Sequence, residues 1–408
     1  MIKPSASIPA PTYRRELTAL TTLFFMWGLI TSLNDILMPH LKAAFELTYT
    51  QTTLIQFCFF SAYFIMSVPA GAAVQRVGYQ RGIIFGLVIA GIGAALFYPA
   101  AQYRVYGLFL GALFVLASGI TLLQVAANPL VALLGSHSSA SSRLTLTQAF
   151  NSLGTTIGPY LGAGLILGGT TALTAVSRVQ LPYLGLAAAF WLLAVVMSLI
   201  RLPGQVQATT TVRRSADPSL FSHRPLLLGV GAIFLYVGGE VSIGSFLVNL
   251  FSEPDIGALS HEDAGRLMSL YWGGAMVGRF IGSWVMHRVK ASQVLTFNAL
   301  AAVVLIALAM LVKGHMAMYA LLAVGLCNSV MFPTIFSLSI DDLGDRVGEG
   351  SGVLCMAIVG GALVPVLMGE MADHVGLLMS FLVPLLCYVY IMYFGVTISR
   401  LTNSVRVS

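Results

Sequence analysis

The chain has 408 residues, of which 57% are hydrophobic and only 9% are charged. Soluble globular proteins carry about 25% charged residues, so this composition excludes a soluble protein and indicates an integral membrane protein. The net charge of +6 does not indicate a nucleic-acid partner, because the basic residues are distributed among the connections between apolar segments.

Twelve apolar stretches are long enough to cross a bilayer, for which a helix needs about 20 residues. Their continuous apolar character favours helices over the alternating strands of a barrel. We therefore expect an all-α membrane protein with twelve transmembrane helices and no soluble domain. The stretches begin near Leu17, Gln51, Gly82, Val105, Ser142, Pro182, Leu226, Ala264, Gln293, Met316, Gly352 and Leu377.

The first stretch contains an acid, Asp35, within "TSLNDILMPH". A charged aspartate at the bilayer centre costs about 2.5 to 3.5 kcal/mol on insertion scales, so such acids are kept mainly for ion pathways. A second acid, Glu240, lies inside the seventh stretch. We predict that Asp35, Glu240 or both hold a cation, either H⁺ or Na⁺, which the family resemblance described below implies is coupled to transport. The alternative is a structural acid that is hydrogen-bonded to a neighbouring helix.

A glycine- and arginine-containing connection, "GAAVQRVGYQRG" at 71–82, joins the second and third stretches. It resembles the short-loop motif of the major facilitator superfamily, Gly-x-x-x-Asp-Arg-x-Gly-Arg-Arg. Gly71, Arg76, Gly78 and Arg81 match that motif, which implies a role in conformational change. Gln75 replaces the motif's acid, so we expect a hydrogen bond there instead of an ion pair.

Eight amide side chains lie inside the apolar stretches, where they are costly to bury unless paired. A small-molecule site combines a few such groups with aromatic or apolar lining. We predict substrate contacts from these amides, and ring platforms from Tyr63 and Trp272, although amides can also join helices and aromatic residues can simply pack. The family resemblance described below implies that this substrate is a sugar. Two pairs share a helix face by their spacing, Gln124 with Asn128 and Gln148 with Asn151. The remaining amides are Asn34, Gln56, Asn249 and Asn328.

Glycines at four-residue spacing, at 154–162 and 274–282, predict close helix packing. The first set, Gly154-x-x-x-Gly158-Pro159-x-x-Gly162, also resembles the fifth-helix motif of drug/proton antiporters. This resemblance keeps open an alternative function, the proton-coupled export of sugars or drugs.

A long polar connection divides the chain almost in half and is basic, as a linker between two bundles would be. Asp35 and Glu240 are 205 residues apart, and Pro129 and Pro333 are 204 apart. This repetition favours two pseudo-symmetric six-helix bundles. The predicted parts are an N-terminal tail at 1–16, a bundle at 17–202, a linker at 203–224, a second bundle at 225–400 and a C-terminal tail at 401–408.

Five stretches spread along the chain carry a more specific similarity: "LNDILMPHLKAAFELT", "LLQVAANPLVALLG", "LTLTQAFNSLGTTIGP", "FLYVGGEVSIGSFLVN" and "MFPTIFSLSI". They resemble the fucose/galactose/glucose symporters of the major facilitator superfamily. The resemblance implies a twelve-helix alternating-access carrier that brings a monosaccharide inward together with a cation. Gln124 stands where fucose/proton members have a glutamate, and Glu240 matches the glucose/galactose branch, so the resemblance implies a hexose of that type.

The distribution of positive charge orients the chain. Fifteen lysines and arginines lie on the side of the termini, five lie on the other side, and Arg279 lies within a stretch. By the positive-inside rule we expect both termini in the cytosol and a multi-pass protein of the bacterial plasma (inner) membrane. We expect a functional monomer in the lipid bilayer, without a cofactor, a resident metal or nucleic acid.

An enzyme is disfavoured because the seven histidines form no HExxH pattern and no GxSxG elbow is present. The chain also lacks the GxxxxGK[ST] motif, so ATP is not expected to drive transport.

Overall fold

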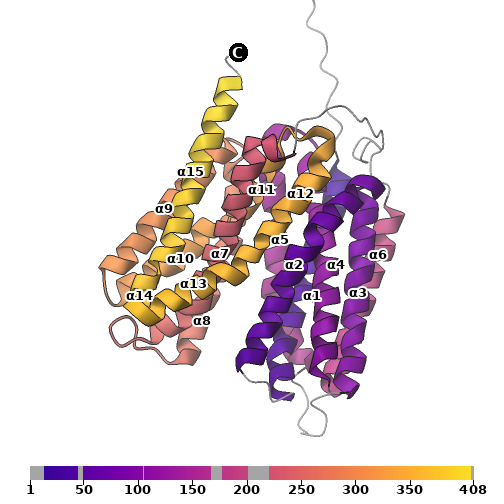
Figure 1. Ribbon diagram of the computed structural model, residues 1–408, viewed down its shortest axis with the longest axis horizontal. Helices are drawn as coiled ribbons and strands as arrows, with labels where there is room; N and C mark the ends of the chain where they lie inside the picture. Colours follow the sequence, from indigo (N-terminus) through magenta and orange to yellow (C-terminus); the bar gives the residue numbers. More distant parts are fainter. Residues whose placement is uncertain (1–12, 45–48, 104, 167–176, 201–219, 406–408) are drawn as a thin grey trace, which may run out of the picture.

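The twelve predicted spans are confirmed as helices. A computed structural model describes residues 13–44, 49–103, 105–166, 177–200 and 220–405, without the side chains of 33–44, 49–53, 159–166, 177–179, 221 and 402–405. Every regular element in these ranges is helical (Figure 1). The first half contains α1 (Arg14–Ala44), α2 (Tyr49–Val77), α3 (Tyr79–Tyr103), α4 (Tyr106–Leu133), η1 (His137–Ser139), α5 (Ala140–Ile166) and α6 (Ser177–Leu199).

The second half begins with η4 (Leu220–Ser222) and has three spans divided into shorter helices. Its first three spans are α7 (Arg224–Ser252), α8 (His261–Val285) and α9 (Ala291–Leu311). The tenth is α10 (His315–Asn328) with α11 (Met331–Ile340), followed by η5 (Gly344–Arg346). The eleventh is α12 (Val347–Met356), η6 (Ala357–Val359) and α13 (Gly360–Val375), and the twelfth is α14 (Leu377–Ser380) with α15 (Leu382–Val405).

Nine stretches of the described residues are long and apolar enough to cross a membrane. The helix α8 is not among them, and it carries Glu262, Asp263 and Arg266 near its start and Arg279 in its interior. Ser260 caps this helix by accepting a hydrogen bond from Asp263 N at 3.1 Å, and the acids of the first turn suit the positive end of the helix dipole.

The helices form two groups of six with the same internal pairing (Figure 1). In the first half α1 packs on α5, α2 on α4, and α3 on both α4 and α6. In the second half α7 packs on α13, α8 on α10, and α9 on both α10 and α15. These pairs are equivalent when six spans are added, so the repeat predicted from the acid and proline spacings is present in the packing. The predicted linker at 203–224 lies mostly outside the described residues, and its boundaries remain a prediction.

A proline explains why the tenth span is divided. Pro333 has no N–H, so it cannot bond to the carbonyl of Ser329, four residues earlier. The helix α10 ends at Asn328 and α11 begins at Met331. The carbonyl of Ser329 is therefore free to bond to a side chain of another helix. Residues 328–331 are called the joint below.

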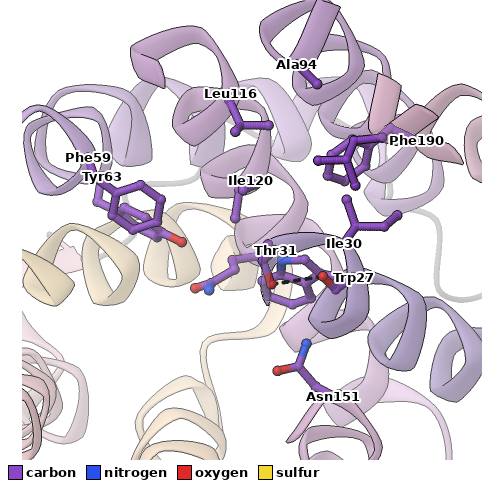
Figure 2. A pocket seen from close by; sticks show the side chains of 12 residues that line it. Trp27, Ile30, Thr31, Phe59, Tyr63, Ala94, Leu116, Ile120, Asn151 and Phe190 are labelled. Atoms are coloured by element: carbon purple, nitrogen blue, oxygen red, sulfur yellow. Dashed lines mark hydrogen bonds between the residues drawn. The ribbon is translucent and has the colours of Figure 1, made fainter. Parts of the chain in front are cut away.

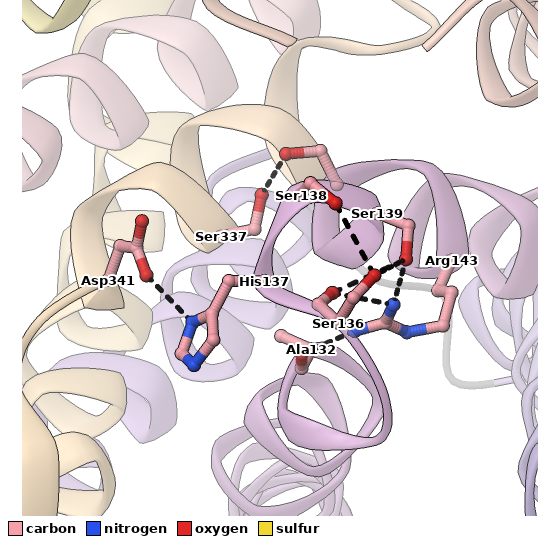
Figure 3. Close-up of polar contacts among 9 residues, drawn as sticks. Ala132, Ser136, His137, Ser138, Ser139, Arg143, Ser337 and Asp341 are labelled. Atoms are coloured by element: carbon pink, nitrogen blue, oxygen red, sulfur yellow. Dashed lines mark hydrogen bonds and ion pairs between the residues drawn. The ribbon is translucent and has the colours of Figure 1, made fainter. Parts of the chain in front are cut away.

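The two halves meet at one side of the molecule, where α1, α5 and α7 begin and α15 ends, which is called the terminus side below. Hydrogen bonds there join the first bundle to the second, and two of them, those of His137 and Ser337, are drawn in Figure 3. They include Ser141 Oγ to Ser337 Oγ at 2.6 Å, Ser142 Oγ to the Ser283 carbonyl at 2.7 Å, His137 Nδ1 to Asp341 Oδ1 at 3.1 Å, Gly348 N to Gln75 Oε1 at 3.1 Å, and Ser351 Oγ to the Val125 carbonyl at 2.8 Å. These bonds, with the one from Arg279 described below, are called the terminus-side gate.

Candidate functional site

The first bundle encloses a cavity of about 300 Å³ between its six helices (Figure 2). Ligand pockets in proteins start at about this size, so the cavity suits a small molecule. Most of the lining is aromatic or aliphatic, with a few polar groups that point inward. The lining residues are Trp27, Ile30, Thr31, Phe59, Tyr63, Ala94, Leu116, Ile120, Gln124, Asn151, Leu186 and Phe190.

Two of the predicted amides, Gln124 on α4 and Asn151 on α5, line this cavity. The Oε1 atom of Gln124 is buried and has no hydrogen-bond partner in the described part of the chain. Asn151 Nδ2 donates to the carbonyl of Phe24 on α1 at 2.9 Å, so its carbonyl oxygen is left for another donor. Both amides thus offer an acceptor to a ligand that carries hydroxyl groups.

Aromatic rings surround these amides. Tyr63, predicted as a platform, lies in the cavity wall with Phe59, and their ring centroids are 5.4 Å apart. Trp27 and Phe190 complete the aromatic lining and were not predicted. The sequence spacing could have indicated Phe59, because it precedes Tyr63 by one helical turn and therefore lies on the same helix face.

The helix α1 contributes Trp27 and Thr31 to the cavity wall, four residues apart. Asp35 follows Thr31 on the same helix after another four residues. The hydroxyl of Thr31 donates to the Trp27 carbonyl at 2.9 Å, as Figure 2 shows. Asn34 and Asp35 lie on the last turns of α1, where the structure describes the backbone but not the side chains. Their predicted roles therefore lie outside the described part of the molecule.

The other two members of the predicted pairs bond to each other instead of lining the cavity. Gln148 Nε2 on α5 donates to Asn128 Oδ1 on α4 at 3.3 Å, and both residues are buried. Asn128 Nδ2 has no partner in the described residues. The pair holds α4 against α5 next to the cavity, which is the helix-joining role that such amides often have.

In the second bundle, Glu240 lies in a cluster of hydroxyl and amide groups. Asn328, a predicted site residue, is fully buried at its centre. Its Nδ2 donates to Tyr271 Oη at 2.7 Å, and its Oδ1 accepts from Tyr388 Oη at 2.7 Å. Tyr271 Oη lies 3.4 Å from the Glu240 carbonyl oxygen, and Tyr236, which precedes Glu240 by one helical turn on α7, donates to the Asn328 carbonyl at 3.2 Å. The three tyrosines were not predicted, since single tyrosines in apolar spans are ordinarily packing residues.

A cation, Arg279 on α8, joins this cluster to the first bundle. Its Nε donates to the Ser329 carbonyl at 3.3 Å, which Pro333 leaves free. Its Nη1 donates to Ser152 Oγ on α5, and its positive charge acts on Glu240. Because Ser152 follows Asn151, Arg279 connects the Glu240 cluster with the helix that lines the cavity.

Three further predicted residues lie away from the cavity and the cluster's hydrogen bonds. Gln56 on α2 and Asn249 on α7 are exposed. Trp272 is 43% exposed and stands edge-to-face on Tyr271, with ring centroids 5.1 Å apart. It therefore borders the Glu240 cluster without bonding to it.

The loop motif lies at the terminus-side gate. Gly71 packs so closely on α12 that an added Cβ would lie 2.8 Å from the Gly348 carbonyl oxygen, and Gly78 turns the chain with a φ of +91°. The hydrogen bond predicted for Gln75 is confirmed, because this side chain accepts from Gly348 N and donates to the Asp345 carbonyl. Arg76 and Arg81 are exposed on the same side.

The glycine sets have the packing role that was predicted. A Cβ on Gly154 would lie 2.2 Å from the Phe25 carbonyl oxygen on α1, and one on Gly158 would overlap Ser32 Oγ. On α8, a Cβ on Gly278 would lie 2.6 Å from Ser329 Oγ at the joint. These glycines bring α1 onto α5 and α8 onto the joint.

A cation at this site would have a single described carboxylate to bind. Within the described residues, no three histidine, cysteine, aspartate or glutamate side chains gather as they would around a metal ion.

Comparisons with known proteins agree with this architecture. Residues 20–364 match the model of the Major Facilitator Superfamily. The chain is 54% identical over 391 residues to a glucose/galactose transporter of Brucella abortus biovar 1 (strain 9-941), covering 95% of both chains. It is 35% identical over 400 residues to the L-fucose-proton symporter of Escherichia coli (strain K12), covering 92% of this chain and 91% of the symporter. The crystal structure of FucP, a Major Facilitator Superfamily transporter in the outward conformation, matches with a TM-score of 0.87 and 33% identity, over 95% of this chain and 99% of that one.

Proposed function

This chain belongs to the Major Facilitator Superfamily, and from that premise we propose that it carries a glucose- or galactose-type hexose inward together with a cation. The protein is a transporter and not an enzyme, since its relatives are named as transporters. The relatives named glucose/galactose transporters support the hexose class, and those named L-fucose-proton symporters support H⁺ as the coupling ion.

The observation that carries the sugar assignment is the cavity of the first bundle. It combines two amide acceptors, Gln124 and Asn151, with the rings of Trp27, Tyr63 and Phe190. A monosaccharide has hydroxyl groups for the amides and an apolar C–H face for a ring, so it matches both kinds of lining group.

The cation would be held by carboxyl groups within the spans. Glu240 is the described candidate, and Asp35 is the candidate on α1 that follows the cavity residue Thr31 by one turn. One positive charge moving through about 100 mV releases about 2.3 kcal/mol. Since about 1.4 kcal/mol corresponds to a tenfold gradient, one coupled cation could concentrate a neutral sugar by about fiftyfold.

Alternating access is supported by the closure of one side. The terminus-side gate joins the bundles near the helix ends, and α5 and α8 also meet farther from that side, where Thr156 Oγ1 and Met276 Sδ are 3.5 Å apart. If the charge distribution places the termini in the cytosol, the closed side is the cytosolic one. The described arrangement is then the outward-facing state, from which sugar and cation enter.

The export alternative rested on the glycine motif of α5. The packing of Gly154 and Gly158 on α1 accounts for these glycines without an antiport role, and the two amide acceptors of the cavity, Gln124 and Asn151, favour a ligand with hydroxyl groups over an apolar drug. We therefore favour uptake.

A vesicle uptake experiment tests the proposal. Purified protein in liposomes should accumulate labelled glucose or galactose when a proton gradient is imposed, with mannose, fucose and a sodium gradient as parallel arms. Accumulation driven only by a sodium gradient would identify Na⁺ instead of H⁺ as the coupling ion. Accumulation of fucose alone would contradict a glucose- or galactose-type substrate. Expulsion of preloaded sugar as protons enter would replace the symporter by the antiporter.

A further inference from the structure

The helices α9 and α15 lie side by side at one edge of the second bundle (Figure 1). They approach closely near the start of α9 and the end of α15, where a Cβ added to Gly395 would lie 2.5 Å from Thr296 Oγ1. Beside this contact is a groove of about 410 Å³, which is called the α9/α15 groove below. Its residues belong neither to the sugar cavity, nor to the Glu240 cluster, nor to the terminus-side gate.

The α9/α15 groove changes from polar to apolar along the two helices. Gln293 of α9 and Ser399 and Arg400 of α15 line its end on the terminus side. Phe297 and Leu300 line the part farther from that side, about one and two turns after Gln293. A helix rises about 1.5 Å per residue, so Gln293 and Leu300 are separated by about 10 Å along α9. A phospholipid has the same order, from a polar headgroup to apolar chains.

The apolar part of the groove faces outward. Phe297 is 70% exposed and Leu300 is 47% exposed. Because α9 is long and apolar enough to cross a membrane, its exposed apolar side chains meet the acyl chains of the bilayer.

The polar end of the groove is positively charged. Arg400 is exposed and keeps its charge, and its guanidinium makes no hydrogen bond or ion pair within the described residues. Arg288 and Lys290 lie just before the start of α9, on the same side. Neither α9 nor α15 contains an aspartate or a glutamate. This end of the groove therefore suits an anionic group, since no acid of either helix neutralises it.

The equivalent helices of the first bundle, α3 and α6, are joined by a glutamine side chain. Gln80 Nε2, near the start of α3, donates to the Met197 carbonyl on α6 at 2.9 Å. The side chain of Gln293, near the start of α9, has no hydrogen bond in the described part of the chain. Its amide N–H groups are left to donate to a ligand in the groove.

We propose that the α9/α15 groove binds an anionic phospholipid. The phosphate of the headgroup accepts hydrogen bonds from Arg400 and Gln293, and one acyl chain lies along Phe297 and Leu300. Hydrogen bonds between an arginine and a phosphate are charge-assisted and are stronger than those between neutral groups. If the charge distribution places the termini in the cytosol, this lipid belongs to the inner leaflet, whose surface is negatively charged.

Lipid contact with the groove can be measured by fluorescence in liposomes. Phe297→Trp places a tryptophan in the groove, and the same chain with Phe297 gives the signal of the four native tryptophans, which is subtracted. The liposomes are phosphatidylcholine with increasing amounts of either phosphatidylglycerol or phosphatidylcholine that carries bromine on its acyl chains, because bromine quenches a tryptophan that it touches. The readout is the lipid preference, which is the ratio of the two binding constants from the quenching curves.

The Phe297→Trp chain should prefer phosphatidylglycerol about fivefold, the effect of one basic side chain at an anionic lipid surface. Adding Arg400→Gln should bring the preference close to one. Arg288→Gln is the matched control, because it removes the same charge from the same side while its guanidinium lies over the Trp284 ring of α8, 4.6 Å from the centroid. It should leave the preference unchanged.

Equal quenching by the two brominated lipids, or a preference that survives Arg400→Gln, would overturn the inference. An equal loss of preference in Arg288→Gln would also overturn it, since the cause would then be diffuse surface charge. Inorganic phosphate at constant ionic strength should not relieve the quenching, and relief would assign the groove to free phosphate instead of a lipid. Quenching by neither lipid would contradict the inference in favour of a second copy of the chain seated on the groove. The test needs no transported sugar, so its result is independent of the proposed function.

Discussion

Replacing Gln124 by methionine should weaken sugar binding without weakening the protein. The Oε1 atom of Gln124 faces the cavity, is buried, and has no partner in the described residues. Methionine has a similar length and no comparable acceptor, so the change removes one neutral hydrogen bond to the sugar, which contributes about 0.5 to 1.5 kcal/mol. At about 1.4 kcal/mol for each factor of ten, the Kd should rise about two- to twelvefold.

The quenching of Trp27 fluorescence by galactose would measure this Kd, because that ring lines the same cavity. The melting temperature without sugar should not fall, since no described protein group loses a partner. Gln80→Met is the matched control, because Gln80 Nε2 donates to the Met197 carbonyl at 2.9 Å and joins α3 to α6 outside the cavity. It should lower the melting temperature and leave the Kd unchanged. An unaltered Kd in Gln124→Met would refute the placement of the sugar in this cavity.

Three further changes test the fold and the gate. Gly154→Ala should destabilise the protein by about 1 to 3 kcal/mol, because its Cβ would meet the backbone of α1 at 2.2 Å, and thermal unfolding would detect this. The disulfide between Ser141→Cys and Ser337→Cys should stop sugar uptake, and reduction should restore it. Lys313 bonds to Asp255 at 2.6 Å and holds the pKa of that carboxyl below its usual value, so the pair stabilises the fold above about pH 3.9 and ceases to do so as the pH falls through the lowered pKa. The difference in melting temperature between wild type and Asp255→Asn should therefore be small, since the pair is exposed, and should vanish on acidification.

Each of these changes has its control or contrary result. Gly185→Ala on α6 meets no atom within 4 Å and should be neutral or stabilising, so equal effects at both glycines would count against the packing argument. Continued uptake by the fully oxidised disulfide variant would show that the gate need not open. If the difference in melting temperature between wild type and Asp255→Asn grew on acidification, the lowered pKa of Asp255 would be contradicted.

Much of the fold followed from the sequence because a membrane leaves few choices. Continuous apolar runs of about 20 residues can only be helices in lipid, and the spacing of Pro129 and Pro333 revealed the repeat. The consequence of these prolines required coordinates, because spacing does not say which group bonds to a freed carbonyl. Ser351 bonds to the one freed by Pro129, and Arg279 bonds to the one freed by Pro333.

The site was predicted in part. Gln124 and Asn151 line the cavity, and Asn328 lies at the centre of the Glu240 cluster, because polar groups in an apolar span must serve either a partner or a ligand. Spacing along one helix could not reveal that Asn128 and Gln148 bond to each other, since that contact depends on how α4 and α5 pack. Trp27 and Phe190 were missed because an aromatic residue in a span has the same pattern whether it lines a cavity or a core.

The most direct test of the account is the steady-state accumulation ratio of galactose in liposomes under a fixed proton gradient and membrane potential. The account predicts that wild-type protein concentrates the sugar severalfold or more, and that Asp35→Asn with Glu240→Gln together brings the ratio to one while exchange of sugar down its own gradient continues. An accumulation ratio in the double variant equal to that of the wild type would contradict the claim that carboxyl groups inside the spans couple the cation to the sugar.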